Sequence, residues 1–238
     1  MIKTIDVDKH FGDVHALDNV TMTVKTGSIY GLVGTNGSGK TTILKHITGI
    51  LKPDSGEITI SDIPVFENDE AKEKFAFIPD ELFFQGNYNL KDMSKLYSKI
   101  YSKWNQDRFD ELIDKFDLNR TKKITRFSKG MQKQAAFALA IATMPDYLIL
   151  DEPVDGLDPL IRRIVWDTIV GDVAERKMTV LISSHNLREL DGICETVGIL
   201  YKGKLIFEKE IDEENMSLED IFIKELGGEH SEYKELLS

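Results

Sequence analysis

The strongest constraint on the fold of this chain is a glycine-rich stretch between an apolar run and a helical pattern. Residues 34–42 fit the pattern Gly, four residues, Gly-Lys-Thr. The apolar residues 29–33 precede it and predict a buried strand, and residues 41–50 follow it with apolar side chains at helical spacing. Strand, loop and helix in this order predict an α/β core whose loop wraps a chain of phosphates.

The residue types of this loop suit a triphosphate. Backbone N–H groups reach phosphate oxygens only where no Cβ atom holds them away, which explains the glycines. The following helix directs the positive end of its dipole at the phosphates. We expect Lys40 to contact the β- and γ-phosphates and the Thr41 hydroxyl to hold Mg²⁺. The predicted nucleotide-binding residues of the loop are Gly34, Thr35, Asn36, Gly37, Ser38, Gly39, Lys40, Thr41 and Thr42.

Composition limits the partners of the chain. The net charge is -11 over 238 residues, which argues against a nucleic-acid partner and against direct adhesion to an anionic bilayer. Such a charge suits a partner with basic loops, and cytoplasmic loops of membrane proteins are basic. The single cysteine, Cys194, excludes an internal disulfide and fits a reducing compartment. The chain opens without a signal-peptide pattern, and no apolar stretch is long enough to span a membrane.

Two later strands are expected to end in chemically useful side chains. The apolar residues 147–150 lead into Asp151 and Glu152, and the apolar run 178–183 leads into His185. In a phosphate-loop protein Asp151 can hold the metal, Glu152 can polarise the attacking water and His185 can contact the γ-phosphate. The alternatives are two solvated acids at a strand end and a structural histidine.

Residues 81–126 change the pattern to helices rich in aromatic side chains. Apolar residues recur at helical spacing from Met93 to Tyr101 and from Phe109 to Phe116, which predicts a helical lobe inserted between strands of the main sheet. Most of these aromatics are expected to form the core of the lobe. Phe83, Phe84 and Tyr88 fit either that core or a groove for a partner helix.

The next predicted helix has an unusual start. Ser128 is a suitable N-cap for a helix that runs to about residue 143, but Lys129 in the first turn opposes the helix dipole. The lysine is either solvated or placed there for an anion. Phe11, beside the turn at residues 10–13, either covers the edge of a sheet or stacks on an adenine ring, and spacing alone favours the first reading.

In order and spacing these motifs resemble the ATPase subunit of ABC transporters over nearly the whole chain. Residues 34–42 resemble the Walker A motif, 148–152 Walker B with its catalytic glutamate, and 155–158 the D-loop. The resemblance implies that His185 is the switch histidine, that Phe11 stacks on adenine, and that Ser128, Lys129 and Gly130 form the signature that binds nucleotide on a partner chain.

The resemblance also implies a fold and its subdivision. The expected fold class is α/β, a P-loop NTPase (RecA-like) core with an antiparallel β-subdomain and an inserted α-helical subdomain. Within a single domain over residues 1–238, the core and β-subdomain take residues 1–80 and 144–210, and the helical subdomain takes 81–143. A C-terminal accessory helix and tail take 211–238.

Several positions depart from the family pattern. Lys129 replaces a signature glycine, and Met131 replaces the signature glutamine. Asp80 stands where the Q-loop glutamine is expected and can still ligate Mg²⁺, and Asp155 stands where the D-loop usually has serine. The set resembles the ABC-2-type branch of bacterial exporters, whose ATPase and membrane subunits are separate polypeptides.

We therefore expect an ATP-binding subunit that binds MgATP, pairs head to tail with an identical or paralogous ATPase subunit, and hydrolyses ATP to drive a separate membrane permease. It would lie in the cytoplasm, on the inner face of the membrane. The main alternative is a soluble regulatory ABC ATPase without transport. A repair or translation ATPase and a phosphate-loop kinase or GTPase are disfavoured, because the chain shows neither coiled coils nor a basic face, and no lid or base-reading motif.

Overall fold

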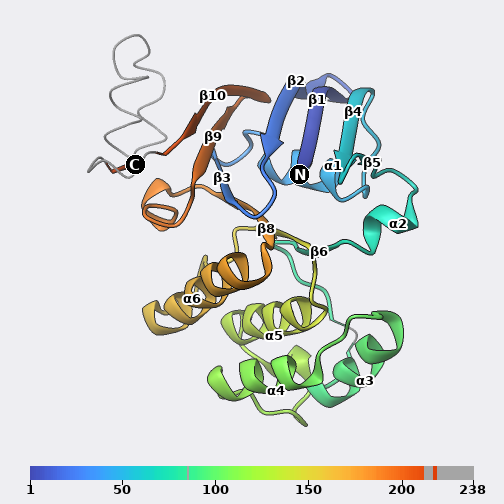
Figure 1. The fold of residues 1–238 in the computed structure, drawn as a ribbon, viewed down its shortest axis with the longest axis vertical. Helices are drawn as coiled ribbons and strands as arrows, with labels where there is room; N and C mark the ends of the chain where they lie inside the picture. The colour runs from blue at the N-terminus through green and yellow to red at the C-terminus, as the bar shows by residue number, and fades with distance from the viewer. Residues whose placement is uncertain (85, 212–216, 219–238) are drawn as a thin grey trace.

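Two β-sheets and a helical lobe make up the protein (Figure 1). The computed structural model describes residues 1–84, 86–211, 217 and 218. The accessory helix and tail predicted for residues 211–238 lie outside the described residues, except for Ile211, Ser217 and Leu218, of which Leu218 is buried. Among the described residues, no helix combines the length and the apolar character that crossing a bilayer requires.

The smaller sheet is antiparallel and has four strands. Across the sheet they are β2 (Val14–Val24), β1 (Ile2–Phe11), β4 (Ser55–Ile60) and β5 (Ile63–Pro64). The turn predicted at residues 10–13 is confirmed at Gly12 and Asp13, but both strands run further than predicted, because β1 continues through Phe11 and β2 begins at Val14. The extra length is mostly exposed, so it carries no apolar alternation that could have revealed it.

The larger sheet has six strands and holds the phosphate loop. Across the sheet they are β10 (Lys204–Glu210), β9 (Thr196–Tyr201), β3 (Ile29–Val33), β8 (Thr179–Ser184), β7 (Tyr147–Asp151) and β6 (Phe75–Ile78). All pairs are parallel except β9 with β10, which form an antiparallel hairpin. The carboxyl ends of β3, β7 and β8 therefore lie side by side, which is where ligands bind in open parallel sheets.

Helices connect these strands and form the lobe. They are α1 (Lys40–Ile47), α2 (Asp69–Lys72), α3 (Leu90–Ile100), α4 (Gln106–Lys115), α5 (Lys129–Ala142) and α6 (Pro159–Arg176), with 3₁₀ turns η1 (Ile124–Arg126) and η2 (Leu187–Glu189). Helix α1 ends three residues before its predicted end at residue 50, because Gly49 takes a left-handed φ of 68°. The Asp158 side chain caps α6 by accepting hydrogen bonds from the backbone N–H groups of Leu160 and Ile161.

Helices α3, α4 and α5 lie together, apart from the small sheet (Figure 1). Phe109 and Phe116 of the lobe are buried, which confirms the predicted aromatic core. That core is continuous with apolar residues of the large sheet, such as Leu148 and Leu150. Phe83 is different, because 89% of its surface is exposed. It does not belong to the core of the lobe.

Candidate functional site

The loop between β3 and α1 has the backbone that its glycines predict. Gly37 and Gly39 have left-handed φ values of 80° and 109°. A Cβ atom on Gly34 would lie 2.4 Å from both the Leu200 carbonyl and the Ser38 hydroxyl. This loop therefore tolerates no larger residue at position 34 and disfavours side chains at the other two glycines.

Lys40, the first residue of α1, is held inside this loop. Only 6% of its side chain is exposed, and Nζ donates to the carbonyls of Gly34 at 2.6 Å and Thr35 at 3.3 Å. The ammonium also lies 3.4 Å from Oε1 of Glu152. One buried cation thus joins the loop to the end of β7.

The ends of β7 and β8 and the start of α1 meet at Asp151. Its carboxylate is 1% exposed and accepts hydrogen bonds from the Thr41 hydroxyl at 2.7 Å and from the Ser183 hydroxyl at 2.5 Å. The sequence predicted Asp151 and Thr41 as metal-site residues. It did not point to Ser183, which looks like one more small residue at the end of a buried strand.

Glu152 lies directly after β7 with a left-handed φ of 49°, which is uncommon for a residue with a side chain. Its Oε2 accepts from Nδ1 of His185 at 2.8 Å and from the backbone N–H of His185 at 3.3 Å. The carboxylate is therefore held between His185 and Lys40. The structure brings together the residues that the sequence predicted as catalytic: Glu152, His185 and Lys40.

Lys40 and Glu152, but not His185, border a cavity of about 570 Å³, which is the size of a small-molecule site. Phe11, 46% exposed, lines it together with the loop. Its other predicted lining residues are Thr35, Asn36, Gly37, Gly39, Lys40, Thr41, Thr42, Asp80 and Glu152. The sequence missed Val14, His15, Ala16, Lys202 and Gly203, which reach the cavity only because two hairpin ends fold toward the loop.

Asp80 has a partner that the sequence did not reveal. Nζ of Lys133 lies 3.1 Å from Oδ1 of Asp80 and donates to the carbonyl of Glu152 at 3.0 Å. The one signal in the sequence is that Lys133 lies four residues after Lys129 on α5, which places the two lysines on the same face of the helix. The lobe is thereby tied to both the Asp80 segment and the end of β7.

The start of α5 lies outside this cavity. Ser128 and Lys129 are exposed, Gly130 is half-buried, and none of the three lines the cavity. The Ser128 hydroxyl accepts from the backbone N–H of Met131 at 3.2 Å, as the predicted N-cap requires. A Cβ atom on Gly130 would lie 3.5 Å from Leu157 of the same chain.

The chemistry of the loop fits a nucleotide. The Ser38 hydroxyl is buried and has no hydrogen-bond partner among the described residues, so a ligand oxygen could satisfy it. Lys40 supplies the positive charge that phosphates need. The Thr41 and Asp151 oxygens, 2.7 Å apart, are of the kind that Mg²⁺ prefers.

Comparison with known proteins agrees with this arrangement. The family described as ABC transporter matches residues 17–155, more than half of the chain. The chain is 33% identical to the ABC transporter ATP-binding protein YtrB of Bacillus subtilis (strain 168), over 90% of this chain and 73% of that protein. It is 35% identical to the bacitracin transport ATP-binding protein BcrA of Bacillus licheniformis, over 89% and 70%.

Solved structures show the same fold. A structure described as the ATP-binding subunit of an ABC transporter superposes with a TM-score of 0.84 at 25% identity, covering 100% of this chain and 98% of that one. The predicted fold, a phosphate-loop core with an antiparallel sheet and a helical subdomain, is confirmed. With the loop, the two carboxylates and these relatives, the chain belongs to the ABC transporter family, as an ATP-binding subunit with ATPase activity.

Proposed function

We propose that this chain binds MgATP at the loop after β3 and hydrolyses it with Glu152 as the residue that polarises water. The observation that carries the proposal is the convergence of Lys40, Thr41, Asp151 and Glu152 at one edge of the parallel sheet. Residues 34–42 and Lys40 would hold the phosphates. Thr41 and Asp151 would hold Mg²⁺, which neutralises phosphate charge when bound.

The contacts of Glu152 support its role and suggest how it is controlled. Its two oxygens face Lys40 at 3.4 Å and His185 at 2.8 Å. A γ-phosphate would compete with the Glu152 carboxylate for Lys40 and His185, because each of these two side chains can donate a hydrogen bond to a phosphate oxygen. Phosphate binding therefore releases Glu152 toward the water that it must orient, while His185 remains beside the γ-phosphate.

We propose that a second ATPase subunit, identical or paralogous, completes the site. Lys129 is exposed at the start of α5, where a cation opposes the helix dipole. Phosphates of a nucleotide on another chain would resolve this conflict. Ser128, Lys129 and Gly130 then contact nucleotide in trans, and the chain pairs head to tail.

We propose an integral membrane permease as the third partner. A groove of about 580 Å³ lies between β6, α3 and α5, and Phe83 at its border is 89% exposed. Its aromatic lining suits an apolar helix end, and the net charge of -11 suits basic cytoplasmic loops. In this arrangement the chain lies in the cytoplasm, on the inner face of the membrane, and drives transport. The groove favours this reading over a regulatory ATPase without transport.

The proposed subdivision of the chain follows the same logic. Residues 1–80 and 144–210 form the core and β-subdomain and carry the nucleotide site. Residues 81–143 form the helical subdomain, which carries the start of α5 and one wall of the groove. The accessory helix and tail proposed for residues 211–238 lie largely outside the described residues. That the chain binds no nucleic acid stays a prediction.

Glu152→Gln tests the proposal. The amide keeps the size of the side chain but cannot polarise water, so we expect MgATP binding to persist while phosphate release falls by roughly 10²- to 10⁴-fold. The variant should accumulate as a dimer with saturating MgATP, measured by size-exclusion chromatography with light scattering. Glu175→Gln, at an exposed position of α6, is the matched control. A Glu152→Gln chain that stays monomeric would contradict nucleotide-driven pairing.

A further inference from the structure

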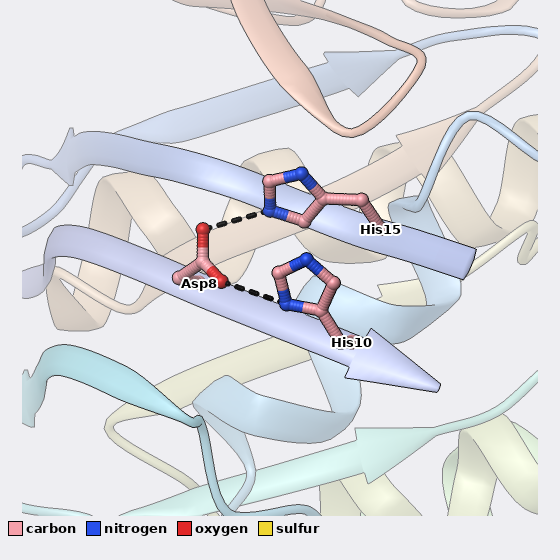
Figure 2. Close-up of side chains that lie close together, drawn as sticks. All are labelled: Asp8, His10 and His15. Carbon is pink, nitrogen blue, oxygen red and sulfur yellow. Dashed lines mark hydrogen bonds and ion pairs between the residues drawn. The ribbon is translucent and has the colours of Figure 1, made fainter. Parts of the chain in front are cut away.

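The exposed end of the β1–β2 hairpin carries two histidines around one carboxylate (Figure 2). Oδ1 of Asp8 lies 3.2 Å from Nδ1 of His10, and Oδ2 lies 2.8 Å from Nε2 of His15. His10 on β1 and His15 on β2 are direct partners in the antiparallel register. The backbone of the hairpin therefore fixes all three residues close to one another.

The two imidazole rings lie face to face. They stack with centroids 3.9 Å apart and planes 9° from parallel. One ligand atom from each of the three side chains lies within 4.8 Å of the other two. Two imidazole nitrogens and one carboxylate oxygen are the donor set of open Zn²⁺ sites.

Two further carboxylates lie next to the cluster. Asp18 lies 3.8 Å from Nδ1 of His15, and Asp54 lies 4.0 Å from Nδ1 of His10. Each is also paired with a lysine, Asp18 with Lys204 at 2.9 Å and Asp54 with Lys9 at 2.7 Å. Asp8 instead directs one carboxylate oxygen at each imidazole, so that the carboxylate and the two rings could bind one metal ion together.

We propose that Asp8, His10 and His15 form a binding site for a divalent transition-metal ion such as Zn²⁺, separate from the proposed Mg²⁺ site. The metal takes the place of the protons through which the two rings contact Asp8, and each ring then carries its single proton on its other nitrogen. Zn–N bonds are about 2.0–2.1 Å long and lie in the plane of the imidazole, so the two stacked rings must rotate about their side-chain bonds to close on one ion.

The position of this site connects it to the cavity. His15 also lines the cavity beside the phosphate loop. Phe11 lines the same cavity and directly follows His10 on β1. A bound metal would crosslink β1 to β2 just before Phe11. The metal site does not depend on the proposed function, since it requires only the hairpin.

The test is a calorimetric titration of the nucleotide-free, full-length chain with ZnCl₂, because nucleotides themselves chelate metals. The test variant is the double substitution His10→Gln and His15→Gln, whose amides can still donate to Asp8 but ligate zinc poorly. His230→Gln controls for loss of a histidine elsewhere in the chain. His185→Gln separates zinc held by the Glu152–His185 pair, whose contact is 2.8 Å.

We expect the parent chain and both controls to bind one zinc ion that the double variant binds at least about 100-fold more weakly, since two of three ligands are removed. Long-range ¹H–¹⁵N spectra should show zinc-dependent shifts at Nδ1 of His10 and Nε2 of His15. Circular dichroism in EDTA verifies that the double variant is folded. Zinc affinity within a factor of about 2 between parent and double variant, or no zinc uptake by the parent, overturns the proposal.

Discussion

Two lysines begin two helices in this protein, and their surroundings are opposite. Lys40 opens α1 and is 6% exposed, with carbonyls of the loop and Glu152 around its ammonium. Lys129 opens α5 and is exposed. Both cations oppose a helix dipole, which is favourable only where an anion binds. The difference fits the proposal that the first lysine belongs to a half-site complete within one chain, and the second to a half-site that another chain completes.

Lys40→Ala should have the largest effect, because it removes the cation from the enclosed half-site. We expect phosphate release to fall by about 10³-fold or more, since the charge acts on phosphates in a buried environment. Nucleotide affinity should fall as well, measured with a fluorescent ATP analogue. Lys45→Ala, in the last turn of the same helix, is the matched control. Unchanged nucleotide affinity in Lys40→Ala would remove this lysine from the phosphate site.

Lys129→Glu should have the next largest effect and a different signature. An acidic residue at this helix start repels the phosphates of the partner chain, so we expect turnover to fall by roughly 10²-fold. Binding of nucleotide to the isolated chain should stay within a factor of about 2 of the parent, because Lys129 does not line that chain's own cavity. If the affinity of the isolated Lys129→Glu chain for nucleotide fell as much as its turnover, the division into two half-sites would be contradicted.

Mixing the two variants sharpens the comparison further. A dimer of one Lys40→Ala chain and one Lys129→Glu chain has one pocket with both lysines altered and one pocket with both intact. If the chains pair head to tail, the mixture should trap nucleotide in the intact pocket, while neither variant alone does so. This is measured in the Glu152→Gln background, where turnover does not empty the site. A mixture no better than its components speaks against pairing in trans.

The enclosed half-site was the more predictable one, because it depends on local order along the chain. The loop, the strand ending at Asp151 and the helix capped by Asp158 each combine a residue pattern with a local backbone. Parallel pairing of β3, β7 and β8 then brings their ends together without further information. The contact between Thr41 and Asp151, each predicted separately to hold Mg²⁺, follows from this topology.

What the sequence failed to predict depends on contacts between distant segments. Lys133 contacts Asp80 across the boundary of the lobe. Ser183 of β8 contacts Asp151 of the neighbouring strand β7. His15 and Lys202 reach the cavity because two hairpins end there. Polar contacts of this kind leave no periodic pattern, since they need only one side chain from each segment.

Phe11→Ala tests the outer end of the enclosed half-site. Stacking of an aromatic ring on a base contributes about 1–3 kcal/mol, so the affinity for ATP should fall by roughly 10-fold. Phe11→Tyr keeps the aromatic face and should bind ATP as the parent does. Inorganic triphosphate, which lacks the base, should bind the parent and Phe11→Ala equally. An equal loss of triphosphate affinity would mean that Phe11 supports the hairpin rather than the base.

Asp80→Asn should have the smallest effect and decides between two roles for this residue. Asp80 is 49% exposed in its ion pair with Lys133, and pairs at the surface contribute about 0–1 kcal/mol, so stability should change little and turnover only a few-fold. If Asp80 acts by tethering α5, Lys133→Gln should give the same change in turnover, and the double variant no more than either. If Asp80 ligates Mg²⁺, Asp80→Asn alone should raise the Mg²⁺ concentration needed for half-maximal turnover. The 3.1 Å contact with Lys133 favours the tether, because it already occupies Oδ1 of Asp80.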